Sequence, residues 1–143
     1  ALDTIRRLKI SGSLLILDVD HLKKFNDTFG HLGGARLLKI YAQIIDDATR
    51  NTDLKARLGG DEFAVFLVGA DMANALYVAE RIRIQVTKDV KKHFPDISWD
   101  QTVSIGLCQA QDDTQSESLI QSADTALYQA KQERNKTVVF ANK

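Results

Sequence analysis

The chain has 143 residues, 44% of them hydrophobic, which suits one globular domain with a substantial core. Lys and Arg number 19, as do Asp and Glu, so the zero net charge gives no support for a general nucleic-acid or membrane surface. The only cysteine, Cys108, excludes an intrachain disulfide and is expected as a small buried hydrophobe, and no apolar stretch is long enough to span a bilayer. We expect one domain over residues 1–143, in a cytoplasmic protein or in the cytoplasmic part of a membrane-anchored one.

The first half of the chain predicts a strand, a long helix and a β-hairpin. Leu14–Leu17 is a continuous apolar run, typical of a strand buried on both faces. The runs Leu54–Leu58 and Phe63–Val68 flank two glycines and predict a hairpin. Residues 1–12, with helical spacing over their first nine positions, are expected to be an N-terminal segment cut from a longer multidomain protein. A long helix is expected after Gly30, because apolar residues recur there at helical spacing: Leu37, Leu38, Tyr41, Ile44, Ile45 and Ala48.

The second half predicts two helices, each followed by a strand. Asp71 can cap the first of these helices, and Pro95 lies in the loop before a strand near Gln101–Cys108. Thr114 and Glu117 form a capping-box pattern that opens the second helix. The closing strand is expected at Thr137–Phe140. The order β-α-β-β-α-β-α-β predicts an α+β domain: a central, largely antiparallel sheet flanked by helices, with a βαββαβ core of the ferredoxin-like, palm type.

Acidic residues stand at the ends of two predicted strands. Asp18-Val19-Asp20 ends the first apolar run, and Gly59-Gly60-Asp61-Glu62 forms the turn of the hairpin. Glycine tolerates positive φ and lets a ligand approach the backbone, while paired carboxylates suit a hard divalent cation. Asp-x-Asp after a strand is a weak pattern, which also begins haloacid-dehalogenase phosphatases and occurs in glycosyltransferases. The two strand ends together predict one metal site, against the alternative of an acidic strand end and a solvated turn.

Five ordered motifs, covering roughly residues 13 to 140, give this chain a family resemblance. Its hairpin turn resembles the signature of the GGDEF domains, the diguanylate cyclases, and the other motifs resemble that family at the family's spacing. The motifs are Leu17–Asp27, Gly30-His31, Gly59–Phe63, Val103–Gly106 and Ala123–Lys131. The Asp-x-Leu-Thr-x-Leu-x-Asn-Arg stretch that usually precedes the family's first strand is absent from this sequence.

The resemblance implies an enzyme that condenses two GTP into cyclic di-GMP and two pyrophosphates across a two-fold homodimer, under the control of a fused or partner sensory domain. It implies two Mg²⁺ ions, or Mn²⁺ in their place, bound by Asp18, Asp61 and the backbone carbonyl of Val19. It also implies that Asp61 takes the proton from the ribose 3′-OH, that Glu62 supports the metal site, and that Lys23 contacts phosphate.

Four further residues are expected to bind the substrate by resemblance. Asn26 corresponds to the contact to the guanine edge, His31 is expected to pack under the base or bond the loop, and Lys131 and Arg134 correspond to phosphate contacts. The sequence departs from the family pattern at Ala35, where the family has an Asp that accepts protons from guanine. Losing that acceptor is expected to cost about 1–3 kcal/mol of guanine binding. The glycine that commonly precedes the family's Arg is also missing, so Arg134 comes one place early.

Arg50 and Asp53 have the Arg-x-x-Asp spacing of the family's inhibitory product site. We expect them to bind cyclic di-GMP, against the alternative of a surface ion pair. Ala35 leaves two rival functions open. One is a catalytically weak or degenerate domain that acts as a cyclic di-GMP receptor through Arg50 and Asp53. The other is a cyclase of relaxed base selectivity that makes cyclic GMP-AMP.

Overall fold

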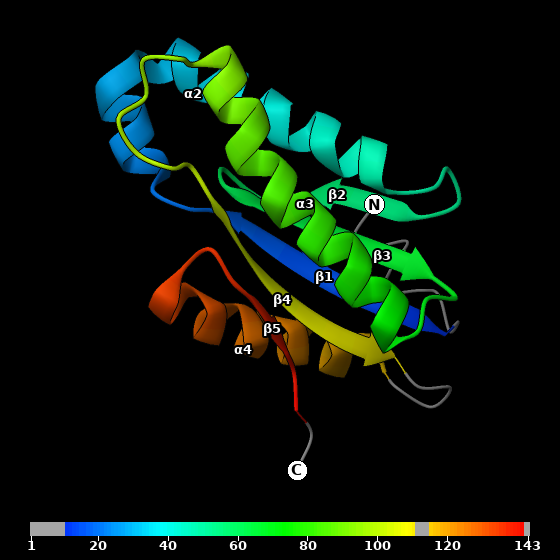
Figure 1. Cartoon of the computed structure of the whole chain (residues 1–143). Coiled ribbons are helices and arrows are strands. Elements are labelled where there is room, and N and C mark those ends of the chain that lie inside the picture. The colour runs from blue at the N-terminus through cyan, green and yellow to red at the C-terminus, as the bar shows by residue number, and fades with distance from the viewer. Residues whose placement is uncertain (1–10, 111–114, 142–143) are drawn as a thin grey trace.

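The computed structural model describes residues 11–110 and 115–141, and its elements follow the predicted order (Figure 1). The strands are β1 (Gly12–Val19), β2 (Leu54–Arg57), β3 (Glu62–Val68), β4 (Val103–Ala110) and β5 (Thr137–Val139). The helices are α2 (Leu22–Ala48), α3 (Met72–His93) and α4 (Ser116–Glu133). The predicted N-terminal helix and the capping residue Thr114 lie outside the described residues.

One five-stranded sheet has the order β2-β3-β1-β4-β5. The pairs β2–β3, β3–β1 and β1–β4 are antiparallel, whereas β4 and β5 run parallel, so the prediction of a largely antiparallel central sheet is confirmed. Because β1 is paired on both sides and covered on both faces, every one of its residues is buried, which explains its continuous apolar run.

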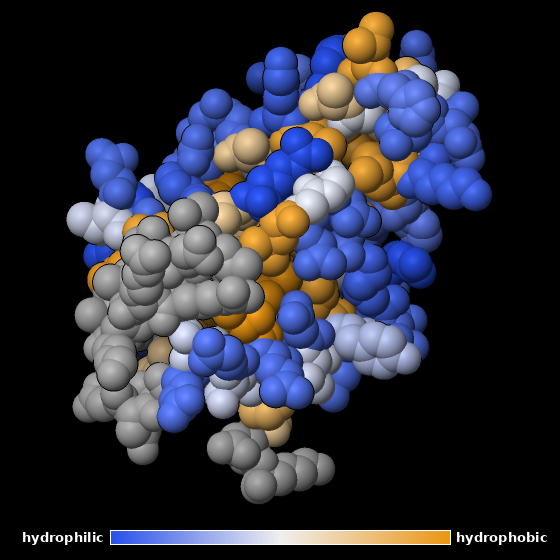
Figure 2. Space-filling model, turned by 180° about the vertical axis from the view of Figure 1, so that it is seen from behind, coloured by the Kyte–Doolittle hydropathy of each residue, from blue (hydrophilic) through white to orange (hydrophobic). Residues whose placement is uncertain are grey.

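Alternate residues of the central strands belong to two different cores. One core joins Leu15, Leu17 and Ile105 to apolar residues of α2 and α3. The other is smaller and joins Leu14, Ile16 and the buried Cys108 to α4. The predicted apolar face of α2, from Leu37 to Ala48, is buried in or packed against the first of these cores. Figure 2, which views the molecule from the side opposite to Figure 1, shows hydrophobic side chains exposed in the middle of that face between hydrophilic ones.

Helix α2 begins earlier than predicted, at Leu22 instead of after Gly30. Gly30 has φ 77° and ψ 172°, a conformation open mainly to glycine, and it divides α2 into two helical pieces at a kink. The first piece buries Phe25, whose ring lies 4.7 Å from that of Phe29 and 4.9 Å from that of Phe94. The motif Leu17–Asp27 is therefore helical from Leu22, and Phe25 and Phe29 fix this first piece of α2 to the core.

Gly106 brings α4 close to the sheet. A Cβ at this position would lie 2.3 Å from both the Ala123 carbonyl oxygen and the Leu127 nitrogen, which are backbone atoms that cannot swing away. Gly106→Ala is therefore expected to destabilise the domain by about 1–3 kcal/mol or more through overpacking. Urea unfolding measures this, with Gly60→Ala as the control, because a Cβ at Gly60 meets no atom within 4 Å. Equal stabilities for the two variants would contradict the expectation.

Candidate functional site

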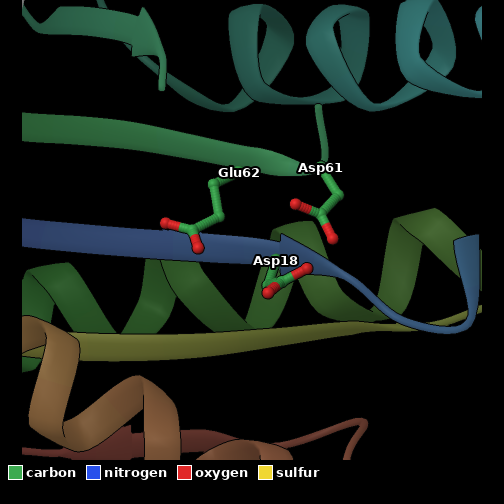
Figure 3. A group of neighbouring side chains, drawn as sticks. All are labelled: Asp18, Asp61 and Glu62. Atoms are coloured by element: carbon green, nitrogen blue, oxygen red, sulfur yellow. The ribbon is translucent and has the colours of Figure 1, made fainter. Parts of the chain in front are cut away.

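Three carboxylates gather where β1 ends and β3 begins. Asp18 lies directly opposite Glu62 in the β1–β3 register, and Asp61 immediately precedes β3. The backbone N–H of Val19 donates to the Asp61 carbonyl oxygen at 2.9 Å, which ties the two strand ends together. One carboxylate oxygen from each of Asp18, Asp61 and Glu62 lies within 4.8 Å of the others (Figure 3). The predicted convergence of the two acidic motifs is therefore confirmed. The carboxylates that converge are those of Asp18, Asp61 and Glu62, and that of Asp20 is not among them.

Asp18 is the buried member of this carboxylate cluster. Asp18 is 4% exposed, its Oδ2 lies 2.6 Å from Lys131 Nζ, and its Oδ1 is buried without a hydrogen-bond partner among the described residues. Burial raises the pKa of Asp18 to about 6, the nearby Asp61 and Glu62 add to the rise, and Lys131 opposes it. Burial also raises the pKa of Glu62, with Asp124 and Asp61 contributing. An unpaired buried oxygen beside two more carboxylates fits a divalent cation, which prefers oxygen ligands.

The raised pKa of Asp18 predicts how the stability of the metal-free domain depends on pH. The ordinary value is 3.8, so between about pH 4 and pH 6 the folded protein keeps a proton that the unfolded chain has released. This contribution to the unfolding free energy is complete below about pH 4 and is lost as the pH rises through about 6. Urea unfolding across this range should show a steeper decline in the wild type than in Asp18→Asn, in which the raised pKa of Glu62 still contributes. Parallel stability profiles for the two proteins would contradict the prediction.

The two glycines of the hairpin turn do not adopt the positive φ that the sequence led us to expect. Neither Gly59 nor Gly60 has positive φ, so the tight turn does not require their conformational freedom. A Cβ at either position would meet no atom within 4 Å, which leaves the backbone of the turn open to close approach. The Arg57 guanidinium donates to the carbonyl oxygens of both glycines at 3.0 Å and holds the turn in place.

The predicted phosphate contacts lie on two different helices or directly after one: Lys23 on α2, and Lys131 and Arg134 in and after the last turn of α4. Lys23 is exposed in the first turn of α2, a helix whose N-terminus no side chain caps. Uncapped N–H groups with a lysine beside them suit an anion. Lys131, in the last turn of α4, reaches the carboxylate cluster directly through Asp18. Arg134 is exposed and ends α4 with φ 63° and ψ 170°, so it occupies a backbone conformation in which glycine is normally found.

The predicted base contacts lie on α2. Asn26 packs against Gly34 so closely that a Cβ there would meet Asn26 Oδ1 at 1.7 Å, and this oxygen is buried without a partner. His31 and Ala35 are exposed. Gly34 thus makes room for the Asn26 amide on the surface of α2, and the next residue, Ala35, supplies no hydrogen-bonding side chain.

Arg50 and Asp53 lie beside a cavity of about 450 Å³ that Leu67, Gly69 and Tyr77 also line. The Arg50 side chain is 67% exposed and donates to the Val68 carbonyl oxygen at 2.7 Å. Asp53 is buried, and its two oxygens accept from the backbone N–H groups of Arg50 (2.8 Å) and Val68 (3.1 Å). Asp53 therefore braces the loop that carries Arg50, and the guanidinium is the exposed group of this pair.

Sequence reasoning missed the residues that surround Asp20. This carboxylate is fully buried and accepts hydrogen bonds from Thr102, Ser104 and Asn135. The alternation of Thr102 and Ser104 with Val103 was the available signal, because two hydroxyls on one face of a buried strand need an acceptor. The same chain segment, Asp18-Val19-Asp20, thus contains one carboxylate in the cluster and one outside it.

The sequence matches the family described as "Diguanylate cyclase, GGDEF domain" over residues 1–137. The curated protein Diguanylate cyclase A of Treponema denticola is 39% identical over 132 residues, which are 91% of this chain and 35% of that protein. The chain thus spans about a third of the length of this relative.

Solved structures give the same picture. An EAL/GGDEF domain protein from M. capsulatus matches with a TM-score of 0.79 and 37% identity, over 99% of this chain and 92% of that one. The GGDEF domain of DgcB from Caulobacter crescentus, solved in complex with c-di-GMP, matches with a TM-score of 0.83 and 28% identity, over 96% of this chain and 82% of that one.

Proposed function

Because this chain belongs to the GGDEF domain family of diguanylate cyclases, we propose that it condenses two molecules of GTP into cyclic di-GMP and two pyrophosphates. The observation that carries this proposal is the cluster of Asp18, Asp61 and Glu62, in which Asp18 keeps a buried oxygen without a partner. Among the described residues, no helix is both long and apolar enough to cross a membrane. GTP as substrate favours a cytoplasmic location for the domain.

Mg²⁺, or Mn²⁺ in its place, is the cation that we assign to the carboxylate cluster, two ions to each complete site. Asp18, Asp61 and the backbone carbonyl of Val19 are the proposed ligands, and Glu62 supports them. A bound divalent cation would neutralise the charge that develops on the leaving pyrophosphate. The buried position of Asp18 strengthens this electrostatic interaction, because fewer water molecules screen it.

The protein's own groups would divide the reaction between them. The 3′-oxygen of each GTP attacks the α-phosphorus of the other, the new O–P bond replaces the bond to pyrophosphate, and the Asp61 carboxylate accepts the hydroxyl proton. Lys23, the N–H groups of the first turn of α2 and Lys131 would bind the triphosphate. Arg134, exposed after α4, is a further proposed phosphate contact. His31, exposed just after the kink, would support the base from the loop side.

Two subunits are needed, because each domain contributes one nucleotide and one set of carboxylates. A two-fold arrangement that places the two half-sites face to face satisfies this requirement. We therefore propose a homodimer as the active form, brought together by a fused or partner sensory domain. Cyclic di-GMP is the proposed ligand of the cavity beside Arg50 and Asp53, where it would act as an inhibitor.

Product analysis tests this function against its rivals. The domain is fused to a dimeric coiled coil and incubated with Mg²⁺ and GTP, ATP or both. The proposal predicts cyclic di-GMP from GTP alone. Cyclic GMP-AMP from the mixture would favour the relaxed-specificity cyclase, to which the missing acceptor at Ala35 points. Binding of cyclic di-GMP without any turnover would instead support the receptor.

Ala35→Asp is expected to tighten GTP binding and to raise the preference for GTP over ATP by about tenfold or more. A restored carboxylate accepts from guanine through charge-assisted bonds, and about 1.4 kcal/mol corresponds to tenfold. Because Ala35 is exposed, the larger side chain should cost little stability. Titrations with GTP and ATP measure the effect, and Ala42→Asp, the same change at an exposed position further along α2, is the control. A wild type that already prefers GTP several thousandfold would contradict this role for position 35.

A further inference from the structure

Asp20 is a fully buried carboxylate whose two oxygens are both engaged. Oδ1 accepts from Ser104 Oγ at 2.7 Å, and Oδ2 accepts from Thr102 Oγ1 at 2.7 Å and from the Asn135 backbone N–H at 3.1 Å. Burying a carboxylate is costly unless such donors surround it. Both oxygens of Asp20 are thus occupied by donors of the protein itself, and Asp20 is not part of the cluster of Asp18, Asp61 and Glu62.

Asp20 and its partners belong to three segments, each of which also lies beside Asp18 or carries Lys131. Asp20 itself directly follows β1, whose last two residues are Asp18 and Val19. Ser104 lies directly opposite Asp18 in the β1–β4 register. Asn135 follows α4, whose last turn carries Lys131 to its ion pair with Asp18. Asp20 thus links the element that carries Asp18 to the element that carries Lys131.

The backbone around Asp20 reinforces this link. Its N–H donates to the Thr102 carbonyl oxygen at 3.1 Å, and its carbonyl oxygen accepts from the buried Gln101 side chain. On the other side, Arg134 and Asn135 both have positive φ, at 63° and 48°. The hydrogen bond from the Asn135 N–H to Asp20 holds a chain reversal that two non-glycine residues adopt at a cost.

We propose that Asp20 is a positioning residue that fixes Lys131 of α4 against Asp18 of β1; its importance for metal binding rests on the function proposed above. The two aspartates of Asp18-Val19-Asp20 then have separate tasks. Asp18 presents its carboxylate to the cation and the phosphates, while Asp20 acts only through Thr102, Ser104 and Asn135. An apolar side chain, such as those of Leu14 and Ile16 on the same face of β1, could fill the space but could not accept these bonds.

The test compares Asp20→Ala, Asp20→Asn and Ser13→Ala in the isolated domain. Asn can keep the bonds, because its oxygen can accept from Thr102 and Asn135 while its amide donates to the Ser104 hydroxyl. Ser13 is the control, since it is also fully buried on β1 and donates to the Ala70 carbonyl oxygen at the end far from the site. Should Asp20→Ala fail to fold, Ser104→Ala removes one donor and takes its place.

The first readout is the NMR signal of the Lys131 ammonium group, whose proton exchange the pairing with Asp18 is expected to slow. This signal should persist in the wild type, Asp20→Asn and Ser13→Ala and be lost in Asp20→Ala. The second readout is Mn²⁺ affinity by electron paramagnetic resonance, expected to fall about tenfold in Asp20→Ala only. An unchanged Lys131 signal in Asp20→Ala, or an equal loss in Ser13→Ala, would overturn the proposal. A wild type that binds no Mn²⁺ would overturn the proposed metal site, while the Lys131 signal would still decide the role of Asp20.

Discussion

Asp61→Asn is expected to lower the turnover of the dimerised domain by about a thousandfold while the fold persists. General-base groups contribute about 10²- to 10⁴-fold, and this carboxylate is also a proposed metal ligand. The fold should tolerate the change, because Asp61 bonds Val19 through its backbone carbonyl, which Asn retains. The measurement is the initial rate of pyrophosphate release from GTP and Mg²⁺, with thermal unfolding of the same samples.

Asp96→Asn is the matched control for Asp61→Asn. Asp96 is an exposed acidic residue in the loop before β4, so it undergoes the same chemical change away from the carboxylate cluster. Its turnover should stay within about twofold of the wild type, as expected for a surface substitution. A turnover of Asp61→Asn within a few-fold of the wild type would show that Asp61 is neither base nor essential ligand.

Arg50→Ala should weaken the binding of cyclic di-GMP at the cavity beside α3 by about a hundredfold or more. A bound ligand would cover the Arg50 guanidinium, and truncating one partner of a buried hydrogen-bonded charge pair typically costs about 2–5 kcal/mol. The exposed Arg50 guanidinium can grip a phosphate or a guanine edge in bidentate fashion. Asp53→Ala is a poorer test, because its carboxylate accepts the backbone N–H groups of Arg50 and Val68 and its loss would disturb the loop.

Isothermal titration calorimetry with cyclic di-GMP measures this effect. Lys55→Ala is the control, because Lys55 is a basic residue of β2, the strand that follows Arg50, and its ammonium pairs with Asp46 outside the cavity. Mn²⁺ affinity should be unchanged in both variants, since neither residue belongs to the carboxylate cluster. Undiminished product affinity in Arg50→Ala would place the product elsewhere and leave Arg50 as a loop-bracing residue.

Local patterns were enough to predict the fold and the meeting of the two acidic motifs. Apolar runs and helical spacing located the strands and helices. The acidic residues at two strand ends predicted that their carboxylates meet at one end of the sheet. The pattern predicts the start of α2 too late, because a glycine before a helical pattern favours a helix start, whereas Gly30 lies at a kink within the helix. The first piece of α2 is held by contacts of Phe25 with Phe94 and Trp99, which lie in a distant part of the sequence.

The supporting residues of the site could not be predicted, because their roles depend on long-range contacts. Lys131 meets Asp18 across 113 positions, and Asn135 meets Asp20 across 115. Asp-x-Asp alone does not say which carboxylate will face the ligand and which will be enclosed by hydroxyls. Likewise, nothing in the sequence indicates that Gly34 makes room for Asn26 or that Gly106 lets α4 approach β4.

The proposed function depends on the binding of a divalent cation by the carboxylates at the ends of β1 and β3. Anomalous diffraction from crystals grown with Mn²⁺ and a non-hydrolysable GTP analogue tests this binding. We expect anomalous peaks within bonding distance of the carboxylates of Asp18 and Asp61 and of the Val19 carbonyl, with the triphosphate beside the first turn of α2. Ordered nucleotide without manganese at these residues, or manganese at a different cluster, would contradict it.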